Sequence, residues 1–261
     1  MLTRLRAVLW LHLIRLWRYK WSFLNRVAGT AIWVLLYLMG ALLFAPPGRL
    51  AESVRVAFWV VAGWTIISSF ASLIGGWTNF FISIGMMEEH VLRGFSPFKV
   101  LLGRVVTGIS VSLGTLAFIG ALLGGAYGVD VLGVEDPLLC LAGLALLSVE
   151  AASYGFLVSS ISVRTTVPYS FLNILNMSTI VLLMVPADAP PGPAGLVLLL
   201  VPYAAPGHLI KASVGAASAL IWEAGLISTA ESLTMALAAL EAVRRAEDWM
   251  RRSGVRAVGY W

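Results

Sequence analysis

Three glutamates, Glu150, Glu223 and Glu231, lie inside long apolar stretches of the sequence, where ionisable side chains are rare. An unpaired charge at the centre of a membrane-spanning helix costs at least about 2.5–3.5 kcal/mol, so each carboxyl group should be neutral, paired or facing water. In a transporter such acids could carry protons, and in an enzyme they could act as acid or base. A purely structural partner for each acid is the alternative.

Other residue types that support chemistry show no usable spacing. His12, His90 and His208 lie far apart, and Cys140 is the single cysteine, so neither a metal site nor a CxxC pair is predicted. The sequence has no GxxxxGK[ST] loop for ATP phosphates, no HExxH and no GxSxG. We therefore expect no catalytic residue, metal or cofactor on this chain, and a packing role for Cys140.

The elements that carry these residues are apolar helices. Hydrophobic residues make up 59% of the 261 positions and charged residues 12%, against about 45–50% and about 25% in soluble proteins. Apolar runs recur along the chain, each near the roughly 20 residues that a helix needs to cross a bilayer. The strands of a membrane barrel would alternate in polarity, whereas these runs are apolar on every side. The sequence predicts an all-α integral membrane protein.

Six spans are predicted within a single transmembrane domain, 1–261. An amphipathic interfacial helix in 1–26 precedes a six-span bundle in 27–243, and a basic tail follows in 244–261. The second span is too long for the bilayer and must tilt or project from it, and Gly75-Gly76 offers a place to bend. The six spans are 28–45, 56–85, 100–127, 138–161, 168–186 and 216–243.

The basic residues predict the orientation. Of the 18 Lys and Arg residues, only Arg49, Arg55 and Lys211 fall in segments assigned to the outer side. Because Lys and Arg collect on the cytoplasmic side, both termini of this multi-pass protein should be cytoplasmic. The net charge of +5 then reflects orientation in the cytoplasmic membrane, and we expect no nucleic-acid partner.

Two further segments do not cross the membrane. Within residues 3–21 a cationic face with Arg4, Arg15 and Arg18 lies beside a leucine face, which suits anionic membrane lipid, although a generic positive anchor predicts the same location. Prolines flank a short apolar run between Val185 and Gly207, which predicts a re-entrant or interfacial hairpin on the outer side before the last span.

The loop between the second and third spans reads Gly85-Met-Met-Glu-Glu-His-Val-Leu-Arg-Gly-Phe-Ser-Pro97. Glu88 and Glu89 precede a short helical turn, Gly94 permits a sharp exit, and Pro97 can begin the third span, where a missing N–H costs little. Such a loop suits a mechanical contact. An ordinary solvated hairpin is the alternative.

This loop resembles the cytoplasmic loop of ABC-2 type permeases, the membrane subunits of ATP-binding cassette exporters. Their pattern is Gly-Thr-Leu-Glu, a few apolar residues, then Pro-x-Ser-Pro. Gly85, Glu88, Ser96 and Pro97 match it, with Met87 in place of leucine, whereas Met86 replaces the threonine and Gly94 the first proline. The surface helix, the outer hairpin and the tail 243–254 resemble the layout of the same family.

The resemblance implies a permease that forms half of a transmembrane dimer, with an identical or related second half. Each half would pair with a cytoplasmic ATPase subunit that binds ATP and Mg. Export is the implied direction, with drugs, lipids or glycan carriers as cargo. The implied coupling helix comprises Gly85, Glu88, Glu89, Gly94, Phe95, Ser96 and Pro97.

Polar residues at helical spacing mark two of the spans. Small and hydroxylated side chains commonly join membrane helices, while the resemblance implies a translocation path instead. They are Thr65, Ser69, Ser72 and Asn79 in span two, with Asn173 and Asn176 in span five.

Two rival functions remain open from the sequence. A proton-coupled secondary transporter would use the three intramembrane glutamates. A lipid-modifying membrane enzyme would need polar groups that converge on one membrane face, and the sequence shows none.

Overall fold

The computed structural model describes residues 2–43, 50–128, 130–165, 169–187 and 193–254, and the regular structure within these ranges is entirely helical. This confirms the expected all-α class for the described part of the chain. In chain order the helices are α1 Leu2–Arg18, α2 Lys20–Leu42, α3 Leu50–Phe70, η1 Ala71–Gly76, α4 Trp77–Ser83, α5 Met86–Leu92, α6 Pro97–Tyr127, α7 Pro137–Ser162, α8 Tyr169–Leu183, α9 Pro193–Leu199, α10 Ala204–Ser213 and α11 Ile221–Ser253.

Five helices in the described residues are long and apolar enough to cross a membrane. The α9–α10 pair, whose arms are bent by 108°, would make a sixth if it were counted as one span. These findings confirm a multispanning helical protein. The five spans are Lys20–Gly40, Leu50–Ser83, Pro97–Gly125, Pro137–Ser162 and Ile221–Ser253.

The segment expected as span five, 168–186, is a shorter helix than predicted. Helix α8 has 15 residues, and at about 1.5 Å per residue it reaches about 22 Å, less than a hydrocarbon core of about 30 Å. Pro168 and Pro186 flank it in the sequence and oppose its extension, because proline disfavours helix both at and before its own position. The helix packs along α3.

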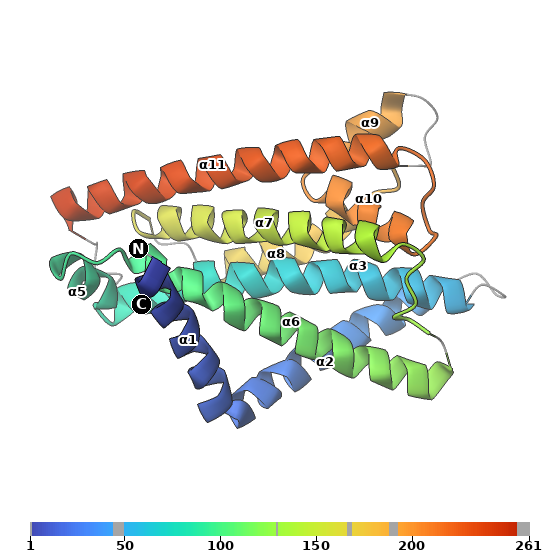
Figure 1. Ribbon diagram of the computed structural model, residues 1–261, viewed down its shortest axis with the longest axis horizontal. Coiled ribbons are helices and arrows are strands. Elements are labelled where there is room, and N and C mark those ends of the chain that lie inside the picture. Colours follow the sequence, from blue (N-terminus) through green and yellow to red (C-terminus); the bar gives the residue numbers. More distant parts are fainter. Residues whose placement is uncertain (1, 44–49, 129, 166–168, 188–192, 255–261) are drawn as a thin grey trace.

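The centre of the bundle is one long helix, Leu50–Ser83, built from α3, η1 and α4. Its middle is π-helical over Ala71–Gly76, where the sequence offered a place to bend. A Cβ atom at Gly75 would lie 2.9 Å from Cγ1 of Val158 on α7, so the glycine permits a close helix crossing. Helices α2, α6, α7 and α8 all contact this central helix (Figure 1). Cys140 is buried in the same core.

The last span and the basic segment after it form one helix. Helix α11 runs for 33 residues from Ile221 to Ser253, so the described part of the expected tail, 244–254, largely continues the helix. Residues 255–261 lie outside the described ranges. At one end of the bundle α5 lies near the C-terminal end of α11, and at the other lie α9 and α10 (Figure 1).

The α9–α10 pair has the geometry of a re-entrant hairpin before the last span. Both arms lie at the same end of the bundle (Figure 1), and α10 is buried over most of its length. Lys211 Nζ donates to the carbonyl of Val185 at 2.6 Å, which ties the hairpin to the end of α8. Protein contact thus covers the α10 arm, as a bent segment at membrane depth requires, whereas α9 is mostly exposed. Residues 188–192 of the expected hairpin lie outside the described ranges.

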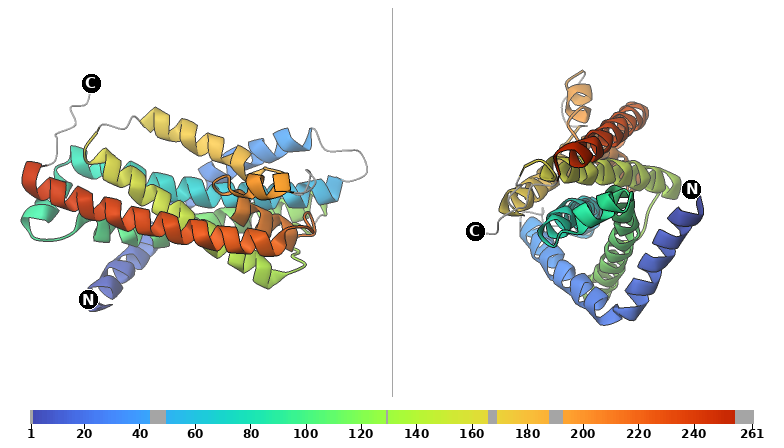
Figure 2. Two further views of the ribbon diagram at one scale, coloured as in Figure 1. Left: turned by 90° about the horizontal axis from the view of Figure 1, so that it is seen from above. Right: turned by 90° about the vertical axis from the view of Figure 1, so that its left-hand side faces the viewer.

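Helices α1 and α2 occupy the side of the bundle away from α11, as the end-on view in Figure 2 shows. Helix α1 runs obliquely to the long axis (Figure 1) and packs against α6. Helix α2 begins at Lys20, earlier than the expected start of span one at residue 28. No proline interrupts the chain there, and long basic side chains reach water from a helix end.

Candidate functional site

Helix α5 is a short helix bounded by two glycines in the left-handed region. Gly85, its N-cap, has φ of 71°, and Gly94, just beyond its end, has φ of 69°. Glycine adopts such values without steric cost, whereas other residues do so rarely. Gly94 therefore has the conformation that a sharp exit from this helix requires.

Buried contacts fix α5 against the bundle. The side chain of Met87 is fully buried in the main core, and the His90 ring stacks on Phe81 at a centroid distance of 6.5 Å. Ser96 is the N-cap of α6, and its hydroxyl also donates a hydrogen bond to the carboxylate of Glu247 on α11. Pro97 is the first residue of α6. The loop is thus attached to α6 and α11 together.

The opposite side of α5 is exposed and chemically mixed. Leu92 is 87% exposed and Phe95 42% exposed, beside the exposed carboxylates of Glu88 and Glu89. Glu89 pairs with Arg93 at 2.5 Å along the helix. Exposed apolar side chains rimmed by charges are typical of protein–protein contacts. A rigid helix with this surface can receive a partner and transmit its movement.

The three intramembrane acids do not form one site. Glu150 on α7 is fully buried, and its Oε1 accepts a hydrogen bond from Ser232 on α11 at 3.1 Å. Glu231, the residue before Ser232, is half-buried, and its Oε2 is a buried atom without a hydrogen bond from the described residues. Glu223 lies exposed in the first turn of α11, where the helix dipole favours an acid, rather than in the middle of a span.

Hydroxyl groups on the central helix bond neighbouring helices or their own helix. The Ser112 hydroxyl of α6 donates to Ser69 of the expected polar stripe at 3.2 Å, and Thr78, outside that stripe, shares a hydrogen bond with Ser159 of α7. Thr65 is buried and donates to the carbonyl of Val61 at 2.8 Å. These contacts fit the packing interpretation of small hydroxylated residues.

The remaining stripe residues have different surroundings. Ser72 accepts a hydrogen bond from Arg26 at 3.1 Å, and Asn79 is half-buried. Asn176 is buried on α8, and its backbone carbonyl accepts a hydrogen bond from the Trp64 indole N–H at 2.8 Å. Asn173 is the one exposed member of the six, so it alone faces the outside of the subunit.

Comparison with known proteins decides the family. Residues 47–240, more than half of the chain, match the family described as ABC-2 family transporter protein. The chain belongs to the ABC-2 transporter family. It is the membrane domain of such a transporter, a multi-pass permease without a nucleotide-binding site of its own. No curated protein matches the chain.

Helix α1, which was expected to be an interfacial helix, turns part of its polar face inward. His12 is 2% exposed, and Arg15 lines a cavity beside α6, while Arg18 is exposed. Trp10 and Trp17, by contrast, are 64% and 80% exposed. The helix thus presents aromatic residues outward, and a basic side chain lies between it and the bundle. The side chain of Arg4 lies outside the described part of the structure.

Sequence reasoning missed two parts of the permease. Glu247 was one acid among the basic residues of the tail, and nothing local indicated that Ser96 would contact it. Arg104 was counted only for orientation, although an arginine inside an apolar span is a signal in itself. It lines the cavity beside Arg15 and Arg26 and lies 3.7 Å from the centroid of the Trp77 ring.

Proposed function

We propose that this permease exports a hydrophobic or amphipathic cargo, such as a drug, lipid or glycan carrier, across the cytoplasmic membrane. It acts as one half of a transmembrane dimer and is driven by ATP hydrolysis on a separate ATPase subunit. The observation that supports this proposal is α5 with the residues that follow it: Glu88, Leu92 and Phe95 are exposed, while Met87 and Ser96 hold this segment to the bundle.

The proposed coupling is mechanical. The ATPase subunit holds ATP and Mg, and nucleotide binding supplies the force that closes its dimer. Movement of a docked ATPase would displace α5 as a unit, because Met87 is buried beneath it. The displacement would reach α6 through Pro97 and α11 through the contact between Ser96 and Glu247. Packed helices that change between two arrangements would then switch access of the cargo.

The orientation follows from charge. Basic residues lie in the α5–α6 connection, after α7 and along the end of α11, so this end of the bundle is proposed to face the cytoplasm together with both termini. The described residues that carry this charge are Arg93, Lys99, Arg164, Arg244, Arg245, Arg251 and Arg252.

The polar residues divide between packing and the path of the cargo. Asn173 is exposed on α8 beside Ile174 and Met177, which are 64% and 42% exposed. This exposed face is proposed to meet the second permease half, whether identical or related. The cargo path would then run between the two halves, with Asn173 contributing to it.

The proposal is tested by purifying the permease from its native membrane and identifying any ATPase that accompanies it. Glu88→Arg should weaken that association, because reversing an interface charge replaces attraction by repulsion. Glu52→Arg is the matched control, since Glu52 is also exposed but lies in the first turn of α3, away from α5. An absence of any ATPase from the wild-type preparation, or equal loss in both variants, would refute the docking role of α5.

A further inference from the structure

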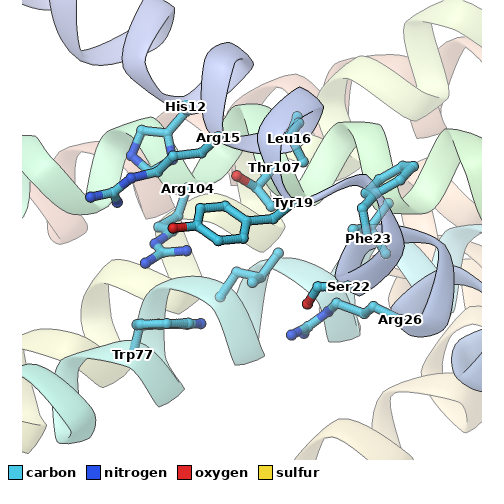
Figure 3. Close-up of a pocket in the computed structure, with 12 residues that line it drawn as sticks. His12, Arg15, Leu16, Tyr19, Ser22, Phe23, Arg26, Trp77, Arg104 and Thr107 are labelled. Carbon is cyan, nitrogen blue, oxygen red and sulfur yellow. The ribbon is translucent and has the colours of Figure 1, made fainter.

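A cavity of about 360 Å³ lies between α1, α2, the central helix and α6. Figure 3 shows Arg15, Arg104 and the ring of Tyr19 near one another, with Arg26 and Ser22 on the other side of the cavity. The cavity is open, because Arg15, Tyr19 and Arg26 are exposed residues. It is separate from α5 and from the glutamates of α7 and α11.

The cavity concentrates positive charge. Its three arginines come from three different elements, Arg15 from α1, Arg26 from α2 and Arg104 from α6, and none of the residues lining it is acidic. Neighbouring guanidinium groups repel one another, and a surrounding of low dielectric constant strengthens the repulsion. An anion between them would remove this repulsion.

The three arginines of the walls carry the type of donor that binds such an anion. Arg104 lies over the Trp77 ring, with Cζ 3.7 Å from the ring centroid, and this cation–π contact fixes its side chain beside the cavity. Arg26 donates to the hydroxyl of Ser72 at 3.1 Å, which holds its guanidinium group at the wall of the cavity. Planar guanidinium groups bind phosphate oxygens in pairs, which makes arginine the preferred residue for phosphate recognition.

His12 reports the same positive surroundings. Burial, followed by the charges of Arg104 and Arg15, lowers the pKa of His12 to about 4. The imidazole is therefore neutral near pH 7, and the positive charge of the cavity comes from the arginines. A neutral imidazole also keeps one N–H donor.

The depth of the cavity suits a lipid headgroup. Arg104 follows Pro97 by seven residues, which places it about 10 Å along α6 from the end that carries α5. Next to it, α1 exposes Trp10 and Trp17, residues that favour the boundary between headgroups and acyl chains. The cavity thus lies beside that boundary rather than at the centre of the bilayer.

We propose that this cavity binds a phosphate group, held by Arg15, Arg26 and Arg104, and that the bound anion fastens α1 to the bundle. The phosphate belongs to the headgroup of an anionic phospholipid or to a soluble phosphate, and both offer the same oxygens to the guanidinium groups. The site is independent of the ATPase contact, since no residue of α5 lines it.

The test uses the full permease purified in uncharged detergent and phosphate-free buffer. Native mass spectrometry measures the retention of added phosphatidylglycerol against diacylglycerol, which lacks the phosphate, and thermal unfolding is followed with either lipid or with inorganic phosphate. Arg15→Gln and Arg104→Gln should each reduce phosphatidylglycerol retention about tenfold, because each removes a charge-assisted hydrogen bond. Arg18→Gln, an equal charge change at an exposed site on α1, is the control and should retain the lipid.

The outcomes separate the sources of the phosphate. Selective retention of phosphatidylglycerol that inorganic phosphate does not displace assigns the site to a lipid headgroup. Displacement of the lipid, with stabilisation by inorganic phosphate alone, assigns it to a soluble anion. If Arg104→Gln does not fold, Arg104→Lys takes its place in the test. This variant keeps the charge but not the paired donors, so it should retain less lipid than wild type. The proposal is overturned if the Arg15 and Arg104 variants retain as much lipid as wild type, or if Arg18→Gln loses as much.

Discussion

The hydroxyl of Ser96 donates a hydrogen bond to the carboxylate of Glu247, across a sequence separation of 151 residues. Ser96 also caps α6, and Glu247 lies on the C-terminal part of α11. One side chain thus connects the loop that carries α5 to two long helices of the bundle. Any force applied to α5 has a direct route into both.

Removing this contact should separate docking from coupling. Ser96→Ala deletes the hydrogen bond to Glu247 and the cap of α6, which costs about 1 kcal/mol in stability. It leaves the outer surface of α5 intact. We therefore expect the ATPase to co-purify as before, while cargo-stimulated ATP hydrolysis falls severalfold. Thr229→Ala is the control, because the exposed Thr229 hydroxyl bonds only the carbonyl of Gly225 in its own helix. If cargo stimulates ATP hydrolysis fully in Ser96→Ala, the hydrogen bond between Ser96 and Glu247 takes no part in coupling.

The backbone at Gly94 provides a second test of the loop. A Cβ atom at Gly94 or at Gly29 would meet nothing within 4 Å, but only Gly94 has a positive φ, 69°. Gly94→Val should therefore strain the loop by about 1–2 kcal/mol, whereas Gly29→Val adds the same side chain without that strain. We expect weaker ATPase association for the Gly94 variant alone, measured by co-purification. If Gly94→Val associates as well as Gly29→Val, the left-handed turn is not needed for docking.

Cysteine labelling tests the orientation. In a Cys140→Ala background, Arg93→Cys and Ser253→Cys should react with a membrane-impermeant maleimide only after the cytoplasmic side is opened, because both positions are exposed at the basic end. Ser218→Cys, exposed between α10 and α11 at the opposite end, should react in intact cells. Labelling of Arg93→Cys in intact cells would mean that the end of the bundle carrying α5 faces the outside, contrary to the proposed orientation.

Neutralising the intramembrane acids distinguishes the permease from a proton-coupled transporter. Glu150→Gln keeps an oxygen that can accept from Ser232, so we expect stable protein and transport that still depends on ATP. Glu223→Gln, at an exposed position, is the matched control. Transport would be measured with and without a protonophore. Transport that persists without ATP and collapses with the proton gradient would favour the secondary transporter.

Acid should weaken the packing of α1. The pKa of His12 is about 4 in the folded protein and near 6.5 when exposed, so the unfolded chain binds more protons between these values. Stability should therefore fall as the pH drops from about 6.5 towards 4. Arg15 from α1 and Arg104 from α6 face the imidazole and oppose its protonation. Thermal unfolding between pH 7 and 5 should show a smaller loss for His12→Gln than for wild type, and equal losses would assign the effect to other groups.

The local features of this protein followed from its sequence alone. Apolar runs of membrane-crossing length determined the helical class, because a backbone in hydrocarbon must satisfy its own hydrogen bonds. Pro97 determined where α6 begins, and Gly85 and Gly94 determined where α5 turns, because these residue types limit or free φ by themselves. The π-helical segment Ala71–Gly76 includes the Gly75-Gly76 step, although the sequence predicted a bend there and not a π-helix.

The contacts that give these elements a function were decided only by tertiary structure. The bond between Ser96 and Glu247, the burial of Glu150 against Ser232, and the approach of Arg15 to Arg104 each join helices far apart in the sequence. The exposure of Glu223 likewise depends on which segments pack against the start of α11. Hydrophobic periodicity shows which face of a helix is apolar, but it carries no information on which other helix covers that face. The packing of the bundle supplies that choice, because only close contact satisfies the polar groups buried between helices.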